Sequence, residues 1–192
     1  LRYYDRVVDC CLANGVTPWM TLYHWELPQA LEEKDGWQNS ETAAAFSRFA
    51  GMMAAHFEGR VSHFITLNEP QIVLKLGYAD GIHAPGKRLS LPELVSCWKN
   101  LMLAHGLSFR AIRKAAPEAL IGIASTGKLC YPHSPADEDA ARQETFRLTD
   151  SDWMFTHAIV LDAVCLGRDE PEAGALRKLL SEVTPEEWDT MH

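Results

Sequence analysis

Three short apolar runs, far apart in the chain, most strongly constrain what this sequence can fold into. They lie near residues 17–23, 61–67 and 120–125, and they are rich in the aliphatic residues that buried strands use. Between them stand segments with the three-to-four spacing of apolar residues typical of amphipathic helices. Connections of this length join parallel strands through right-handed crossovers. The sequence therefore predicts an α/β protein with a parallel sheet.

Local signals set the expected helix boundaries. We predict helices over residues 1–13, 40–59, 90–117 and 140–164, and a last one from Thr184. Asn14-Gly15 is a left-handed stop, and Ser40 is the expected cap of the second helix. Ser90 and Glu93 form a capping-box pattern. The segment 69–89 is expected to be a long loop, and loops of that length are usually functional.

Composition limits the classes of partner. The 192 residues carry a net charge of −8 with acidic and basic residues interspersed, so neither nucleic acid nor an anionic membrane is an expected partner. No apolar run is long enough to span a membrane. The five cysteines fit no disulfide or zinc spacing, which favours a reducing cytoplasm, and Cys10 and Cys11 are expected to be buried, inert thiols. We expect no metal and no cofactor.

Two of the predicted strands end in polar clusters. His24-Trp25-Glu26 follows the first strand, and Asn68-Glu69 ends the second, where Pro70 stops the extended backbone. Parallel strands place both clusters at one edge of the sheet, which is where ligands bind in α/β proteins.

A sugar site needs this set of groups: an aromatic surface, neutral hydrogen-bonding groups and a carboxylic acid. Glu69 is the candidate acid, and His24, Asn68 and Trp25 are the candidate sugar-binding residues. For Trp25, core packing is an equal alternative. For Glu26 we expect a structural role, either pairing with an arginine or capping a loop.

Several stretches resemble glycoside hydrolase family 1, the β-glucosidases. They are residues 21–31, Gly36-Trp37, residues 66–70 and residues 77–86, and Ile121-Gly122-Ile123 is similar to the fifth strand of that family. The resemblance implies a (β/α)8 barrel of which residues 1–192 form one part, about strands three to five with their helices. It also implies that Glu69 is the general acid/base and that His24 and Asn68 bind the sugar of a β-glucoside or short β-linked oligosaccharide.

The sequence departs from that family in three ways. A complete barrel takes about 250 residues or more, so three strands would leave two sheet edges open to self-association. No Thr-Glu-Asn-Gly motif, which carries the nucleophile in the family, occurs in the sequence. Thr126 stands where the family often has asparagine.

Two alternatives therefore stay open. The chain could be a catalytically inactive homologue that binds carbohydrate or serves in assembly. It could also belong to a related barrel, such as an endoglucanase or xylanase, which share Asn-Glu-Pro, although residues 24–31 and 77–86 argue against this. No Gly-x-Ser-x-Gly elbow surrounds Ser125, so an acyl hydrolase is not expected.

Overall fold

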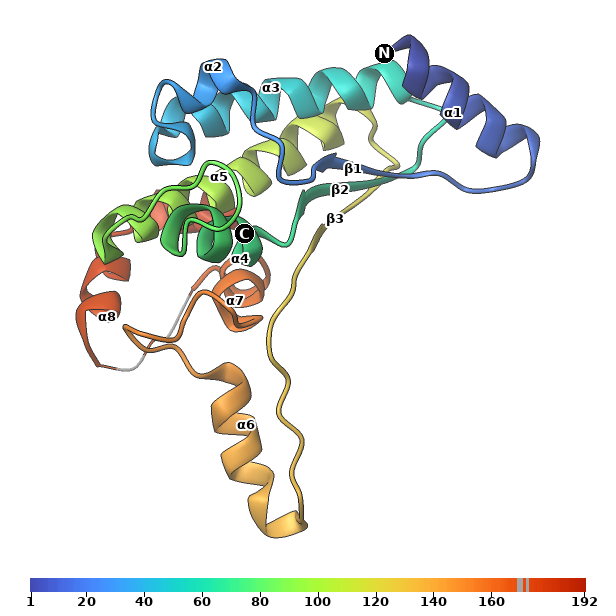
Figure 1. Cartoon of the computed structure of the whole chain (residues 1–192). Helices are drawn as coiled ribbons and strands as arrows, with labels where there is room; N and C mark the ends of the chain where they lie inside the picture. The colour runs from blue at the N-terminus through green and yellow to red at the C-terminus, as the bar shows by residue number, and fades with distance from the viewer. Residues whose placement is uncertain (169–170, 172) are drawn as a thin grey trace.

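A three-stranded parallel sheet organises the chain. The computed structural model describes residues 1–168, 171 and 173–192. Strand β2 (His63–Asn68) lies between β1 (Trp19–Tyr23) and β3 (Leu120–Ala124), and both pairings are parallel (Figure 1). The register aligns the first residue of each strand with that of its neighbour. The three predicted strands and their parallel direction are thus confirmed.

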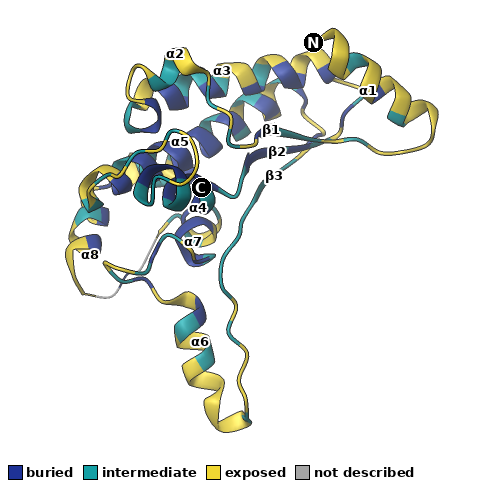
Figure 2. Ribbon diagram, in the orientation of Figure 1, coloured by how far each residue is buried: buried dark blue, intermediate teal, exposed yellow. Residues whose placement is uncertain are grey.

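Two long helices cover one face of this sheet. Helices α3 (Ser40–Phe57) and α5 (Leu91–Ala115) pack against each other along their length (Figure 1). Their facing sides are buried (Figure 2). The side of α5 that faces the core is buried and includes Leu94, Trp98, Leu101, His105 and Ile112.

The buried apolar residues form two clusters, one toward each end of the strands. The amino-end cluster includes Phe57, Val61, Phe64 and Ile112. The carboxyl-end cluster is larger and is built around Trp37, Trp98, Trp153, Leu67 and Ile159. Helix α5 contributes to both clusters, so it connects the two halves of the core.

Helix α1 (Arg2–Ala13) forms as predicted, but its apolar stripe is mostly open. Val8 is its single buried residue, and Tyr3, Tyr4, Val7 and Leu12 are exposed (Figure 2). The expectation of buried thiols is wrong here, because Cys10 is exposed and Cys11 only half-buried. The predicted stop is confirmed, since Gly15 has a φ of +71°.

Most of the predicted caps are present. Ser90 and Glu93 form the capping box of α5, and Thr184 and Glu187 form that of α9 (Pro185–Met191). The predicted cap of α3 is wrong by one residue. Asn39 is the cap, and its side chain accepts a hydrogen bond from the Glu41 amide at 2.9 Å.

The segment 69–89 is not the long loop that was predicted. It begins with a continuous helical stretch, formed by α4 (Pro70–Ile72) and the wider-wound η2 (Val73–Ala79). Pro70 occupies the first helical position, which its fixed φ favours. Val73, Leu74 and Tyr78 are buried, and packing of this kind stabilises a helix despite Gly77 within it.

The single helix predicted over 140–164 is also wrong. The structure has α6 (Glu138–Phe146) and α7 (Ala158–Leu166), with an irregular segment between them. In that segment Asp150 accepts hydrogen bonds from the amides of Ala175 and Leu176, at the start of α8 (Ala175–Leu180). Trp153 is buried in the carboxyl-end cluster. These long-range contacts outweigh the local preference for helix.

Shorter elements complete the described chain: α2 (Gln29–Glu32), η1 (Gly36–Gln38) and η3 (Pro135–Asp137). Among the described residues, no helix is both long enough and apolar enough to cross a membrane.

Candidate active site

The predicted polar residues gather at the carboxyl ends of β1 and β2. His24 and Trp25 follow β1, and Asn68 is the last residue of β2. The Asn68 Nδ2 atom lies 3.3 Å from His24 Nε2, and the Trp25 indole N–H donates to the Asn68 carbonyl oxygen at 2.9 Å. The structure therefore brings together His24, Trp25 and Asn68, with Glu69 next to Asn68 in the chain.

Of the two roles left open for Trp25, core packing is present in the structure. Trp25 is half-buried and packs against the carboxyl-end cluster. Its ring also lies 5.6 Å from that of His83, in the loop that follows η2, so that loop borders the same end of the sheet. Its φ of +77° is in the left-handed region, which few residues other than glycine adopt.

Glu69 is held by its backbone, while its side chain remains available. Its φ and ψ are +46° and +63°, again in the left-handed region. Its amide donates to the Ala124 carbonyl oxygen at 2.8 Å, which ties it to the end of β3. The residue is half-buried, and no hydrogen bond or ion pair joins its carboxyl group to another described residue. A carboxyl group in that position is available to a ligand.

Three further residues at this end, Gln71, Ser125 and His157, were not predicted as part of the site. Gln71 is fully buried, and its amide nitrogen donates to Ser125 Oγ at 2.7 Å. Ser125 Oγ in turn lies 3.0 Å from His157 Nδ1, at the start of α7. The one available signal was the polar character of Gln71, two residues after Glu69 in an otherwise apolar stretch.

Glu26 does not do what was expected of it. It is exposed, and in the described part of the chain it pairs with no arginine. Glu32 instead makes the structural contacts of this region: it accepts a hydrogen bond from the Tyr78 hydroxyl at 2.7 Å and pairs with Lys87. Burial and the neighbouring Glu32 carboxylate together raise the pKa of Tyr78. These contacts fix the segment after η2 against α2.

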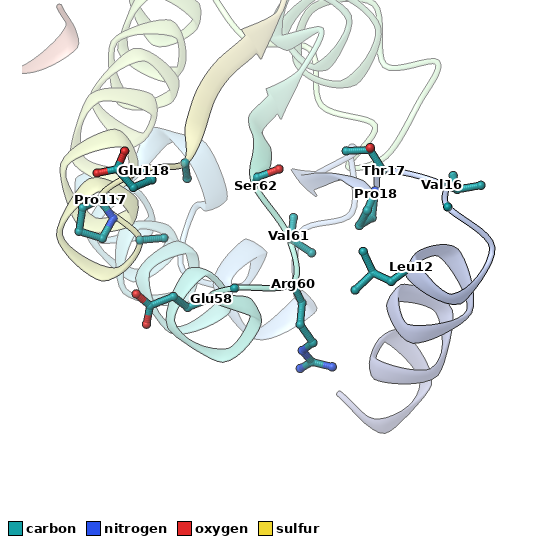
Figure 3. A pocket seen from close by; sticks show the side chains of 14 residues that line it. Leu12, Val16, Thr17, Pro18, Glu58, Arg60, Val61, Ser62, Pro117 and Glu118 are labelled. Atoms are coloured by element: carbon teal, nitrogen blue, oxygen red, sulfur yellow. The ribbon is translucent and has the colours of Figure 1, made fainter.

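A cavity of about 650 Å³ lies at the opposite end of the sheet. Figure 3 shows that its lining comes from the turns before the strands, among them Pro18, Glu58, Arg60, Ser62 and Glu118. None of the predicted site residues lines it. As for metals, no cluster of three or more ligand-type side chains occurs among residues 1–168, 171 and 173–192.

Comparison with known proteins matches this architecture to one family. The model of glycosyl hydrolase family 1 matches residues 1–179. Beta-glucosidase A of Thermotoga maritima is 37% identical over 139 residues, covering 72% of this chain and 31% of the relative. Beta-glucosidase A of Acetivibrio thermocellus is 35% identical over 178 residues, covering 93% of this chain and 38% of the relative.

Solved structures agree with this result. The family 1 β-glucosidase from Thermotoga maritima superposes with a TM-score of 0.82 at 31% identity, covering 99% of this chain and 41% of that protein. The virulence factor SghA from Agrobacterium tumefaciens, solved with its substrate analogue salicin, gives 0.83 at 32% identity, covering 99% and 40%. The chain thus spans less than half the length of these relatives, and its parallel sheet is part of a (β/α)8 barrel. The chain belongs to glycosyl hydrolase family 1.

Proposed function

We propose that this chain supplies the acid/base half of the active site of a retaining β-glucosidase. One observation carries the proposal: Glu69 lies at the carboxyl end of a barrel strand, next to Asn68, which contacts His24, and its carboxyl group is unengaged among the described residues. In this mechanism the acid first protonates the departing glycosidic oxygen and later takes a proton from the attacking water. Glu69 performs both steps.

The neighbouring residues bind the sugar. The Asn68 amide and the His24 imidazole provide neutral hydrogen-bonding groups for its hydroxyls, and Trp25 provides an apolar surface for its ring. The substrate class is a β-glucoside or a short β-linked oligosaccharide. The relatives support this choice, because they are β-glucosidases by name, and SghA was solved with salicin as its substrate analogue.

The proposal includes a limit on the isolated chain. A retaining glycosidase needs a second carboxyl group about 5–5.5 Å from the first, and that group attacks the anomeric carbon. The sequence contains no Thr-Glu-Asn-Gly motif to provide it. Catalytic groups that act as a unit are strongly non-additive, so the acid alone does not give half of the rate.

An assay with an activated aryl β-glucoside tests both parts. We expect the 192-residue chain to release the aryl group no faster than its Glu69→Gln variant. We expect turnover from a complete barrel in which this chain replaces the matching segment of the Thermotoga maritima enzyme. In that barrel Glu69→Gln should lower kcat/KM by about 10²–10⁴-fold for substrates with poor leaving groups.

Two outcomes would overturn the proposal. Strong turnover by the isolated chain that vanishes in Glu69→Gln would reveal a second carboxylate, with Glu26 as the first one to test. A folded barrel indifferent to Glu69→Gln would remove the acid/base role. If that folded barrel were inactive yet bound glucosides, the chain would be a carbohydrate-binding homologue instead.

We also propose that the isolated chain self-associates through its sheet. Strands β1 and β3 are the outer strands, and each has one side without a strand partner in the described structure. Trp19 and Leu120, at their starts, are 65% and 63% exposed. Unpaired edges of this kind favour association. Sedimentation velocity should show dimers or larger species, and a strictly monomeric chain at high concentration would contradict the proposal.

A further inference from the structure

Gln71 is a buried amide whose polar groups all have partners in the described chain. Its Nε2 atom donates to Ser125 Oγ at 2.7 Å and to the Thr156 carbonyl oxygen at 3.2 Å. Its Oε1 atom accepts from the Thr126 amide at 3.5 Å. One side chain thus joins α4 to the segment after β3 and to the segment before α7. Buried amides paired in this way fix the elements they connect.

The hydrogen bonds of Gln71 continue beyond Ser125. Ser125 Oγ accepts a hydrogen bond from Gln71 and also lies 3.0 Å from His157 Nδ1, within hydrogen-bond distance. The relay therefore joins Gln71 through Ser125 to His157, the residue before α7.

Glu69 lies in the turn that the hydrogen bonds of Gln71 attach to the end of β3. Its amide bonds to the Ala124 carbonyl, and two residues later Gln71 bonds to Ser125, the next residue of the same segment. The turn that carries Glu69 is thus attached twice to the end of β3. A left-handed conformation is unfavourable for a residue such as glutamate and persists only where its surroundings enforce it.

We infer that Gln71 is a positioning residue for the acid/base glutamate, acting through Ser125 and the end of β3. This inference rests on the function proposed for Glu69. Gln71 does not touch the sugar; it holds the turn so that the Glu69 carboxyl group keeps one position relative to the glycosidic oxygen. Proton transfer is sensitive to that position, because misplacement of a catalytic group by about 1 Å can lower a rate 10²-fold.

The first test uses the 192-residue chain itself. Gln71→Met has a similar volume but leaves Ser125 Oγ and the Thr156 carbonyl without this donor. We expect hydrogen exchange of the Glu69 amide, followed by NMR, to become at least tenfold faster, while exchange of the Phe64 amide stays unchanged. Unchanged exchange at Glu69 would overturn the inference.

Asn100 offers a matched control for this test. It is also a buried amide that donates to a backbone carbonyl, that of Trp37, at 2.8 Å. An Asn100→Leu variant should lower overall stability without a selective effect at the Glu69 amide. If it accelerated Glu69 exchange as much as Gln71→Met does, the role of Gln71 would be general stability and the inference would fail.

The second test uses the complete barrel and a series of aryl β-glucosides. Loss of acid positioning slows substrates whose leaving groups need protonation, and spares 2,4-dinitrophenyl glucoside, whose leaving group does not. We expect Gln71→Met to lower kcat/KM at least tenfold more for the phenyl glucoside than for the dinitrophenyl one, with Ser125→Ala giving a smaller difference. A purely structural defect would lower both rates equally and overturn the inference.

Glu69→Gln separates this inference from the proposed function. If Glu69→Gln shows no leaving-group dependence, the acid/base assignment itself fails. If Glu69→Gln shows it and Gln71→Met does not, the assignment stands and Gln71 is not a positioning residue.

Discussion

The two ends of the sheet both have left-handed backbone positions next to the strands, but different kinds of residue occupy them. At the amino end, the left-handed positions before β1 and β2 are glycines, Gly15 with φ +71° and Gly59 with φ +75°. At the carboxyl end, the left-handed positions after the same two strands are Trp25 and Glu69. Glycine adopts this region without a steric penalty, whereas residues with a Cβ do not.

The difference indicates where side chains matter. Strained positions that are occupied by a large side chain are concentrated at functional sites, because a glycine there would lack the side chain on which the function depends. The amino end has the larger hollow, about 650 Å³, but the left-handed residues that line it are glycines. The carboxyl end has a smaller cavity, about 70 Å³ beside Trp25, and carries the acid, the amide and the imidazole. The site proposed for Glu69 therefore coincides with the strained side chains rather than with the larger cavity.

The largest expected effect tests whether the two ends form one cooperative unit. Trp98 and Phe57 are fully buried, one in each cluster, and α5 contributes to both clusters. We expect Trp98→Ala and Phe57→Ala each to lower the free energy of unfolding by about 3–5 kcal/mol. Trp98→Ala should cost about 1 kcal/mol more, because it leaves the Ile159 carbonyl without its indole donor.

Denaturant unfolding followed by circular dichroism and by tryptophan fluorescence would measure this. Both variants should shift one shared transition. Two separate transitions, one moved by each substitution, would mean that the ends unfold independently.

A second prediction concerns His105, which lies between the two ends and contacts Thr66 of β2 at 2.7 Å. Burial lowers the pKa of His105 to about 4, from about 6.5 in an unfolded chain. Protonation therefore favours the unfolded state. The contribution to stability is complete above pH 6.5 and is lost as the pH falls from 6.5 to 4, by about 3 kcal/mol in total.

Unfolding free energies measured at several pH values, for the chain and for His105→Gln, would show this effect. The difference between the two pH profiles should appear between pH 6.5 and 4. Parallel profiles over that range would contradict the prediction.

The sequence predicted the strands, and the placement of polar residues at their carboxyl ends, because both depend on local signals. Short apolar runs ended by Asn68-Glu69-Pro70 and by His24-Trp25 place the strand ends without knowledge of the rest. Prediction from the sequence failed where contacts between distant residues determine the structure. Asp150 caps α8 from 25 residues away, and Gln71 donates to Ser125, which is 54 residues away. No local pattern contains those pairings. For α1 the sequence pattern predicted the helix correctly but not its burial, because Val8 is the one residue of α1 that the described structure buries.

The smallest expected effect tests the comparison between the two ends directly. At the amino end, Gly59→Ala should destabilise the chain by about 1 kcal/mol. No heavy atom lies within 4 Å of the added Cβ, so the left-handed backbone is the sole cause. At the carboxyl end, a residue that tolerates the left-handed region should relieve strain rather than add it. Asparagine tolerates the left-handed region, so Glu69→Asn should be more stable than Glu69→Gln by about 0.5–1 kcal/mol, although both remove the charge. Thermal unfolding of the three variants beside the parent chain would give these differences. If Glu69→Asn were no more stable than Glu69→Gln, the conformation of Glu69 would carry no strain, and the contrast between the two ends would reduce to composition alone.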